Sequence, residues 1–245
     1  MRREQSQEKC AQSGTGSGTL FIVGVPIGHP DDLTVRALST LRQVDVVAAK
    51  HPQATQALLS HHGIHGVVTT YDRKHAAEKA PVLLDRLRQG LDIALVSDCG
   101  MPAIYDPGRV LISAASKEHI PIEIIPGTSI VVAAASLCGM DGDSFLFEGR
   151  WSGGRRTITH RLRSMRSEPR TMIFLPPVQI LPVLLSLILT TFGNRRVVVA
   201  FDLTKSTQKI IRGRVGTVLA RNSYHDTAAQ VTLIVEGLRG RGKNR

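Results

Sequence analysis

Residues 93–108 read Ile-Ala-Leu-Val-Ser-Asp-Cys-Gly-Met-Pro-Ala-Ile-Tyr-Asp-Pro-Gly and pass from one kind of structure to another. The four apolar residues at the start predict a buried strand, and the residues after 108 have the apolar spacing of a helix. Two acids, two glycines and two prolines lie between them. This composition predicts a rigid loop that exposes backbone amides at the carboxyl end of a strand, where open α/β sheets bind ligands.

The same alternation of strand and helix extends outward in both directions. The strand candidates are Leu20–Val25, Val44–Ala48, Val67–Thr70, Ile93–Val96 and Ile122–Ile125. The helix candidates are Asp31–Leu41, Thr55–His62, Ala76–Gln89, Gly108–Lys117 and Ser129–Cys138. Such alternation predicts an α/β fold with a mostly parallel sheet that helices cover on both faces.

A second set of elements follows the pause at residues 139–142. Its strand candidates are Ser144–Phe147, Thr171–Leu175, Arg196–Phe201 and Gln230–Val235. The predicted organisation is a disordered leader (1–19), an N-terminal α/β domain (20–141), a C-terminal α/β domain (142–238) and a basic tail (239–245).

The stretch from Ile173 to Phe192 has no charged residue and is long enough to cross a bilayer. Prolines 176, 177 and 182 interrupt it, however, and Gly193 follows it. These breaks predict a strand, a loop and a buried helix in place of a membrane span.

The chain is basic, with 31 Lys and Arg against 20 Asp and Glu in 245 residues. A formal net charge of +11 suits a polyanionic partner such as RNA, although part of the excess lies in the terminal tails. A run of arginines near the start of the second domain would either bind phosphates along an RNA backbone or form a solvated helix face (Arg150, Arg155, Arg156, Arg161, Arg163, Arg166 and Arg170).

Cysteine and histidine spacing gives no sign of a metal or disulfide site. The three cysteines have no C-x-x-C spacing, so a reducing cytoplasm is expected. His61, His62 and His65 cluster, but no carboxylate or cysteine set joins them in the sequence, and no metal is expected.

Three segments supply candidate binding residues. Gly28, after the first strand, either lets a ligand approach the backbone or forms a plain βα turn. In the 97–108 loop, Asp98 and Asp106 can accept hydrogen bonds from an amino or ribose hydroxyl group, and Gly100 leaves room for a nucleoside. In the segment Pro126-Gly-Thr-Ser129, the amides that open the next helix suit a carboxylate or a phosphate.

The order of these motifs resembles the ribosomal RNA small-subunit methyltransferase I family of the tetrapyrrole methylase superfamily. The shared patterns are L-F-I-V-x-x-P-I-G, V-S-D-x-G-x-P-x-I-x-D-P-G, I-P-G-x-S, E-P-R-T-x-I-F, L-T-K and L-I-V-E-G. They extend from Leu20 to about Gly237. The resemblance implies two α/β domains with S-adenosylmethionine in the cleft between them, a homodimer, and methyl transfer to a cytidine 2′-hydroxyl.

Carried onto this sequence, the resemblance implies a cofactor site and one catalytic residue. The cofactor-binding residues are Gly28, Asp98, Gly100, Met101, Pro102, Ile104, Asp106, Pro126, Gly127, Thr128 and Ser129. Lys205 matches the lysine of the family's E-L-T-K segment, where it would orient the acceptor or help to deprotonate it. The alternative is an ordinary surface lysine at a strand end.

The chain also departs from the family pattern. Ala49-Lys-His-Pro-Gln53 replaces A-E-D-T-R, Phe174–Ile180 replaces F-Y-E-S-x-H-R, the basic loop is shortened to 150–156, and Gln230 replaces a glutamate. Three hypotheses therefore remain: a methyltransferase of ribosomal RNA, a methylase of a tetrapyrrole or other small acceptor, and a non-catalytic homologue that binds RNA.

Overall fold

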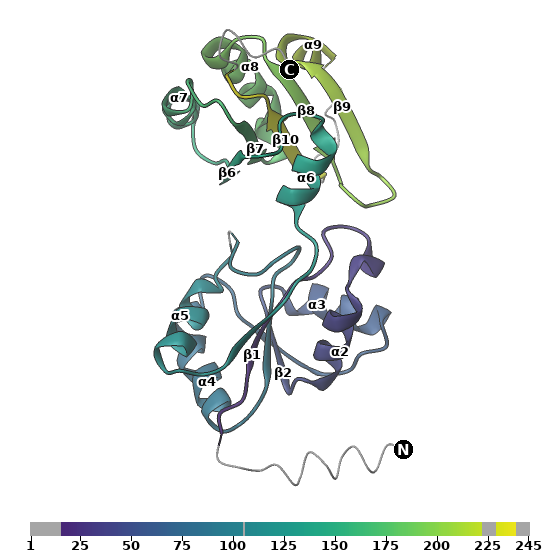
Figure 1. Cartoon of the computed structure of the whole chain (residues 1–245), viewed down its shortest axis with the longest axis vertical. Helices are drawn as coiled ribbons and strands as arrows, with labels where there is room; N and C mark the ends of the chain where they lie inside the picture. The colour runs from purple at the N-terminus through teal and green to yellow at the C-terminus, as the bar shows by residue number, and fades with distance from the viewer. Residues whose placement is uncertain (1–15, 105, 222–228, 239–245) are drawn as a thin grey trace. The chain divides into compact units, whose positions relative to one another are not determined.

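The structure is a computed structural model that describes residues 16–104, 106–221 and 229–238. Most of the predicted leader and the whole basic tail lie outside these residues. The chain forms two compact units (Figure 1). The first holds the described residues up to Pro26 together with Pro30–Thr128, and the second holds Ile27–His29 and the residues from Ser129 onward.

The first unit is built on a five-stranded sheet in which every strand pair is parallel. Its strands are β1 (Leu20–Val23), β2 (Val46–Ala49), β3 (Val67–Thr70), β4 (Ile93–Val96) and β5 (Ile122–Ile125), in the order β3-β2-β4-β1-β5. The first strand of the chain therefore lies between β4 and β5. The predicted parallel sheet is confirmed.

Helices cover both faces of this sheet, as predicted. On one face lie α2 (Val35–Gln43) and α3 (Pro52–His61), and on the other lie α4 (Ala76–Arg88) and α5 (Arg109–Lys117), as Figure 1 shows. Each face has its own apolar core: Leu41 and Leu59 belong to the first, and Leu83 and Leu111 to the second. The helix expected at 31–41 is a 3-10 turn, η1 (Pro30–Asp32), followed by α2, whose N-cap is Thr34.

The second unit contains a mixed sheet in the order β6-β7-β10-β8-β9. The strands are β6 (Phe145–Arg150), β7 (Thr171–Leu175), β8 (Arg196–Phe201), β9 (Lys209–Arg214) and β10 (Val231–Val235). β6 and β7 are parallel, whereas the other pairs are antiparallel. The sequence did not indicate β9, which forms a hairpin with β8.

The helices of the second unit are α6 (Ile130–Cys138), α7 (Arg155–Ser164), α8 (Leu181–Phe192) and α9 (Val215–Arg221), with a short 3-10 helix η2 (Val178–Ile180) before α8. Residues of α7, α8 and α9 share one apolar core with the sheet, and this core includes the buried Trp151. The Trp151 ring meets Phe174 edge to face at 5.0 Å. α6 packs on β7 and β10.

The uncharged stretch at 173–192 divides into the end of β7, η2 and α8, as its prolines predict. Pro182 lies in the first turn of α8, where proline is tolerated, and Gly193 ends the helix with a φ of 83°. Among the described residues, no helix is long and apolar enough to cross a membrane.

The two compact units divide at 128/129, whereas the sequence places the domain boundary at 141/142. The difference is one helix, because α6 packs on the second sheet. Residues 27–29 also belong to the second unit, although they follow β1 directly.

Candidate functional site

Three segments of the first unit meet where β1 ends. Val25 and Gly100 exchange two backbone hydrogen bonds, of 3.0 and 3.1 Å, and the Thr128 hydroxyl donates to the Val25 carbonyl at 2.7 Å. A Cβ on Gly24 would lie only 2.7 Å from the backbone of Gly127. The structure thus brings together the predicted residues Gly100, Gly127 and Thr128 at the carboxyl edge of the sheet, because β1 lies between β4 and β5.

The loop after β4 is held by internal hydrogen bonds. The buried Ser97 hydroxyl donates to the carbonyls of Cys99 and Gly100, each at 3.0 Å. Gly100 has a φ of 72°, a left-handed conformation that favours glycine. The backbone conformation therefore favours glycine at this position independently of any ligand.

The remaining predicted residues of this loop differ in exposure. Pro102 is buried, and Met101 lies against Gly24. Ile104, in contrast, is 57% exposed. Ile104 therefore presents an apolar side chain that a ligand can reach.

Asp98 is paired with two residues that immediately follow β2. Lys50 Nζ lies 2.6 Å from Asp98 Oδ2, and His51 Nδ1 lies 2.7 Å from Asp98 Oδ1. Lys50 Nζ is also 3.9 Å from Asp106 Oδ1. Burial raises the pKa of Asp98, but the hydrogen bonds from Lys50 and His51 outweigh it and hold that pKa below its ordinary value.

Sequence reasoning did not place Lys50 and His51 in this site, although both stand out as departures from the family pattern. The signal that could have found them is strand order. β2 and β4 are parallel neighbours, so the residues after their carboxyl ends lie side by side.

The second unit holds three predicted site residues: Gly28, Ser129 and Lys205. Gly28 packs on the turn after β8, where a Cβ would lie 2.4 Å from the Leu203 carbonyl oxygen and 2.9 Å from Lys205 Cγ. Packing therefore accounts for this glycine. Ser129 is the N-cap of α6, with its hydroxyl 3.4 Å from the Val132 amide.

Lys205 belongs to a turn with unusual backbone geometry. Asp202 and Thr204 have φ values of 47° and 67°, which are rare for residues other than glycine. Lys205 Nζ donates to Asp202 Oδ1 at 2.8 Å. Burial raises the pKa of Asp202, and the contacts from Lys205, Gln230 and Thr207 outweigh that effect, so the pKa is lowered. The ion pair fixes the lysine stem while an ammonium retains further hydrogens to donate.

The arginine run of the second unit includes residues with structural roles. Arg161 binds the Glu148 carboxylate with Nε at 2.9 Å and covers the Trp151 ring at 4.4 Å. Arg170 binds Glu168 at 2.7 Å and lowers the pKa of that carboxyl to about 2, with burial opposing the shift. These two arginines are neutralised by carboxylates within the fold.

One premise drawn from the sequence is wrong. Asp31 does join the histidine cluster, with Oδ1 3.0 Å from His61 Nε2, because η1 lies beside the end of α3. The side chains of Asp31, His61 and His62 place ligand atoms within 4.8 Å of one another. His62 Nε2 lies 3.0 Å from the Pro30 carbonyl, however, and the expectation of no metal stays a prediction.

Sequence comparison gives the family. The sequence model of the Tetrapyrrole (Corrin/Porphyrin) Methylases matches residues 19–219. The chain belongs to this family. Curated relatives of this tetrapyrrole methylase include two proteins named ribosomal RNA small subunit methyltransferase I, one from Thermotoga maritima and one from Escherichia coli O157:H7. The Thermotoga protein is 33% identical, and the match covers 90% of this chain and 99% of the relative. The Escherichia protein is 35% identical, and the match covers 97% of this chain and 82% of the relative.

Solved structures confirm the fold of this tetrapyrrole methylase. Cobalt precorrin-4 methyltransferase, a cobalamin biosynthetic enzyme, matches with a TM-score of 0.64 and 23% identity over 89% of this chain and 94% of its own. Diphthine synthase matches with a TM-score of 0.69 and 15% identity, and the match covers 89% of this chain and 90% of that protein. The predicted family, fold class and methyltransferase class are thereby confirmed.

Proposed function

We propose that this chain transfers a methyl group from S-adenosylmethionine to the 2′-hydroxyl of a cytidine in small-subunit ribosomal RNA. The names of its relatives support the RNA substrate. The structural observation that carries the proposal is the junction at the end of β1, where Val25 bonds to Gly100 and Thr128. This junction holds together the loops that follow β4 and β5 at the carboxyl edge of a parallel sheet, which is where open α/β sheets bind ligands.

The residues of this edge fit the methyl donor. Ile104 offers an exposed apolar surface for a purine or a methionine chain. Asp98 and Asp106 supply carboxylate oxygens for amino or hydroxyl donors, and each oxygen has more than one lone pair, so pairing with Lys50 leaves acceptor capacity. When bound, S-adenosylmethionine supplies an electrophilic methyl group on a sulfonium.

The acceptor requires a group that positions its oxygen for in-line attack. Lys205 meets this need in the proposal, because Asp202 fixes its stem and Nζ still has hydrogens to donate to a ribose oxygen. Lys205→Ala should lower the rate of transfer about 100-fold with little change in donor affinity, whereas Lys205→Arg should retain part of the rate.

The control for this substitution is thermal unfolding. Lys205→Ala leaves Asp202 with the Gln230 amide and the Thr207 hydroxyl as partners, so the fold should persist with a modest loss of stability. A Lys205→Ala protein that transfers methyl groups at the wild-type rate would exclude Lys205 as the orienting group.

A second candidate function is a non-catalytic homologue that binds RNA. The observation in its favour is the pairing of Lys50 and His51 with Asp98, because these residues stand where the family pattern has two acids. In that case the carboxylate holds the loop together and accepts nothing from a ligand.

Two measurements decide between these functions. Calorimetric titration with S-adenosylmethionine and its demethylated product tests the cofactor, and we expect micromolar affinity for both. Transfer of labelled methyl groups to small-subunit ribosomal RNA, followed by mapping of ribose methylation, tests turnover. Donor binding without transfer would favour the non-catalytic function, and no donor binding would refute the cofactor assignment.

We also propose that the protein works in the cytoplasm as a homodimer without a metal. The cysteine usage and the resemblance to the family support this assignment. Sedimentation equilibrium should give twice the monomer mass of 26.6 kDa, and treatment with a chelator should leave methyl transfer unchanged. A monomeric mass, or activity lost with the metal, would contradict it.

A further inference from the structure

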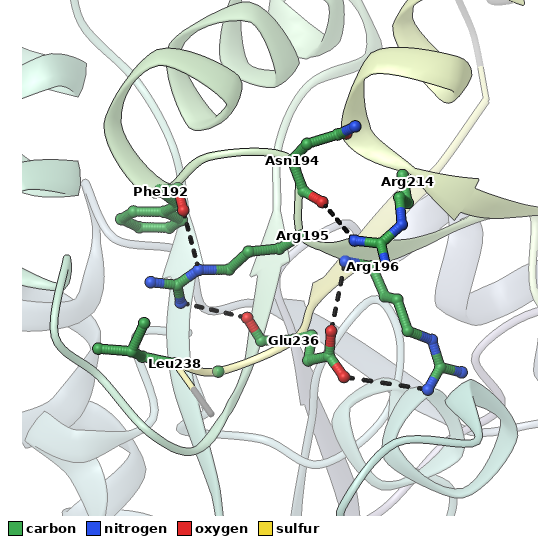
Figure 2. A pocket seen from close by; sticks show the side chains of 8 residues that line it. Phe192, Asn194, Arg195, Arg196, Arg214, Glu236 and Leu238 are labelled. Atoms are coloured by element: carbon green, nitrogen blue, oxygen red, sulfur yellow. Dashed lines mark hydrogen bonds and ion pairs between the residues drawn. The ribbon is translucent and has the colours of Figure 1, made fainter. Parts of the chain in front are cut away.

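Two neighbouring cavities in the second unit are lined by arginines. Each has a volume of about 360 Å³, and they share Arg196 and Arg214. Arg195 lines the first cavity and Arg212 the second (Figure 2 shows the first). Glu236 is the single acid among the lining residues. We call the two cavities together the arginine groove.

The register of the β8–β9 hairpin explains how these arginines converge. Arg196 is paired directly with Arg214, and Val198 with Arg212. Paired residues point to the same face of a sheet, as do residues two apart on one strand. Arg196, Arg212 and Arg214 therefore project from one face of the hairpin, where like charges directly opposite each other destabilise a sheet.

Backbone carbonyls, which carry no net charge, hold these guanidinium groups in place. Arg212 donates to the Leu137 carbonyl at 2.6 Å, and Arg214 donates to the Asn194 carbonyl at 2.9 Å. Arg195 is buried and donates to the carbonyls of Phe192 and Glu236, each at 3.2 Å, as Figure 2 shows. The guanidinium groups of Arg195, Arg212 and Arg214 are thus fixed in position by uncharged partners.

The charge balance of the groove favours an anion. Four arginines line the groove together with one carboxylate, that of Glu236, which lies 3.9 Å from Arg196. Arg195 is buried and its guanidinium nitrogens donate to three backbone carbonyls, so Arg196, Arg212 and Arg214 are the arginines that offer donors to a ligand. The C-terminus of α6 adds the equivalent of about half a negative charge. Each guanidinium has five donors, and the fork geometry matches phosphate oxygens. Arg161 of α7 and Arg170, which precedes β7, differ because each is paired with a glutamate.

We infer that the arginine groove binds consecutive phosphates of the RNA backbone and so anchors the RNA on the second unit. This inference rests on the proposed RNA substrate and names the surface that holds it. Phosphate contacts position an RNA without reading its sequence, which suits a groove built from guanidinium groups. It also favours a solvated helix face for the exposed arginines of α7, which the control variant below tests.

The test compares two charge-matched double variants in RNA binding. Arg212→Gln/Arg214→Gln removes two exposed groove arginines, and Arg155→Gln/Arg163→Gln removes two exposed α7 arginines as the control. Binding of a small-subunit ribosomal RNA transcript is measured from 50 to 300 mM salt. The groove variant should bind roughly tenfold or more weakly, with a salt slope reduced by about 1 per arginine.

Two further measurements keep the outcome interpretable. Arg212→Lys/Arg214→Lys keeps both charges and should keep the wild-type salt slope, and emission from the buried Trp151 reports whether the second unit is folded. The proposal would be wrong if the folded Arg212→Gln/Arg214→Gln protein kept the wild-type RNA affinity and salt slope. It would also be wrong if the α7 control lost as much RNA affinity as the groove variant. Wild-type protein that binds RNA but transfers no methyl group would refute the proposed function and leave the groove standing, whereas wild-type protein that binds no RNA would refute both.

Discussion

The carboxyl edge of the first sheet and the arginine groove of the second sheet differ in the charges they hold. At the edge, the carboxylates of Asp98 and Asp106 lie beside Lys50 and an exposed Ile104. In the groove, guanidinium groups outnumber carboxylates by four to one. The first composition suits a small ligand with amino and hydroxyl donors, and the second suits phosphates.

This difference implies that binding of the methyl donor and binding of RNA are separable. Each region is positioned by its own sheet and has its own apolar core. Substitutions at the edge should change donor affinity and leave RNA affinity unchanged, and substitutions in the groove should do the reverse. Ile104→Lys and Gly100→Ala test that separation.

The largest expected effect comes from Gly24→Val. A Cβ at this position meets the Gly127 backbone at 2.7 Å, and backbone cannot move aside as a side chain can. We expect the first unit to lose more than about 3 kcal/mol of stability, which is at the upper end for overpacking. Far-ultraviolet circular dichroism measures unfolding of the whole chain, and Trp151, the single tryptophan, reports on the second unit alone.

The control for this variant is Gly66→Val, because a Cβ there has no neighbour within 4 Å. The unfolding midpoint of Gly24→Val measured by circular dichroism should lie well below that of Gly66→Val. The midpoint measured by Trp151 emission should fall less. Equal shifts in both signals would mean that the two units unfold as one.

Ile104→Lys should weaken donor binding about 30-fold, which is equivalent to about 2 kcal/mol. The substitution removes an exposed apolar contact and brings a cation toward a ligand that carries a sulfonium. Val82→Lys on α4 is the matched control, since that residue is also exposed but points from the middle of a helix. Calorimetry should separate the two variants, and equal donor affinity in both would place the cofactor elsewhere.

Gly100→Ala should cost of the order of 1 kcal/mol in stability, because an alanine must adopt the left-handed conformation at a φ of 72°. The cost falls on the 97–108 loop and leaves the groove untouched. Urea unfolding measures it, and RNA affinity should equal that of wild type. An alanine variant as stable as wild type would show that the loop relaxes to another conformation.

The smallest effect concerns the pairing of Asp98. Lys50→Met should raise the pKa of Asp98 toward its ordinary value, because the strongest hydrogen bond to the carboxylate is lost. In wild type, pairing stabilises the charged form. Its contribution is therefore complete above the ordinary aspartate pKa and is lost as the pH falls through the lowered value.

We expect this contribution to be below about 1 kcal/mol, since both side chains are partly exposed. Carbon-13 titration of the Asp98 carboxyl gives the pKa directly, and a comparison of wild-type and Lys50→Met unfolding between pH 3 and 6 gives the stability. An unchanged titration midpoint would show that His51 alone sets the pKa.

Much of the fold follows from the sequence where apolar runs are short and well bounded. β3, β4, β5, β7 and β8 have the predicted bounds. Lys209–Arg214 was missed because it carries three basic residues and lies at the edge of the sheet, so its pairing with β8 is visible only in three dimensions. The same strand provides two arginines of the groove.

The candidate site shows the same limit. Gly100 and Thr128 could be assigned to one edge because both follow strands, but the partners of Asp98 depend on β2 lying beside β4. The contact between Asp31 and His61 likewise depends on how η1 meets the end of α3. Local patterns predict elements, whereas contacts between side chains require the order of the strands.

The order β3-β2-β4-β1-β5 has a consequence for the timing of folding. β1 leaves the ribosome first, yet its two sheet neighbours are residues 93–96 and 122–125. Its first neighbour is therefore made only about 70 residues later and its second about 100 residues later, and synthesis proceeds at roughly 5–20 residues per second. Residues 27–29 wait longer still, because they pack on the turn at Leu203–Lys205. For several seconds the nascent chain therefore exposes an unpaired apolar strand, and we expect chaperones to bind the chain during this interval.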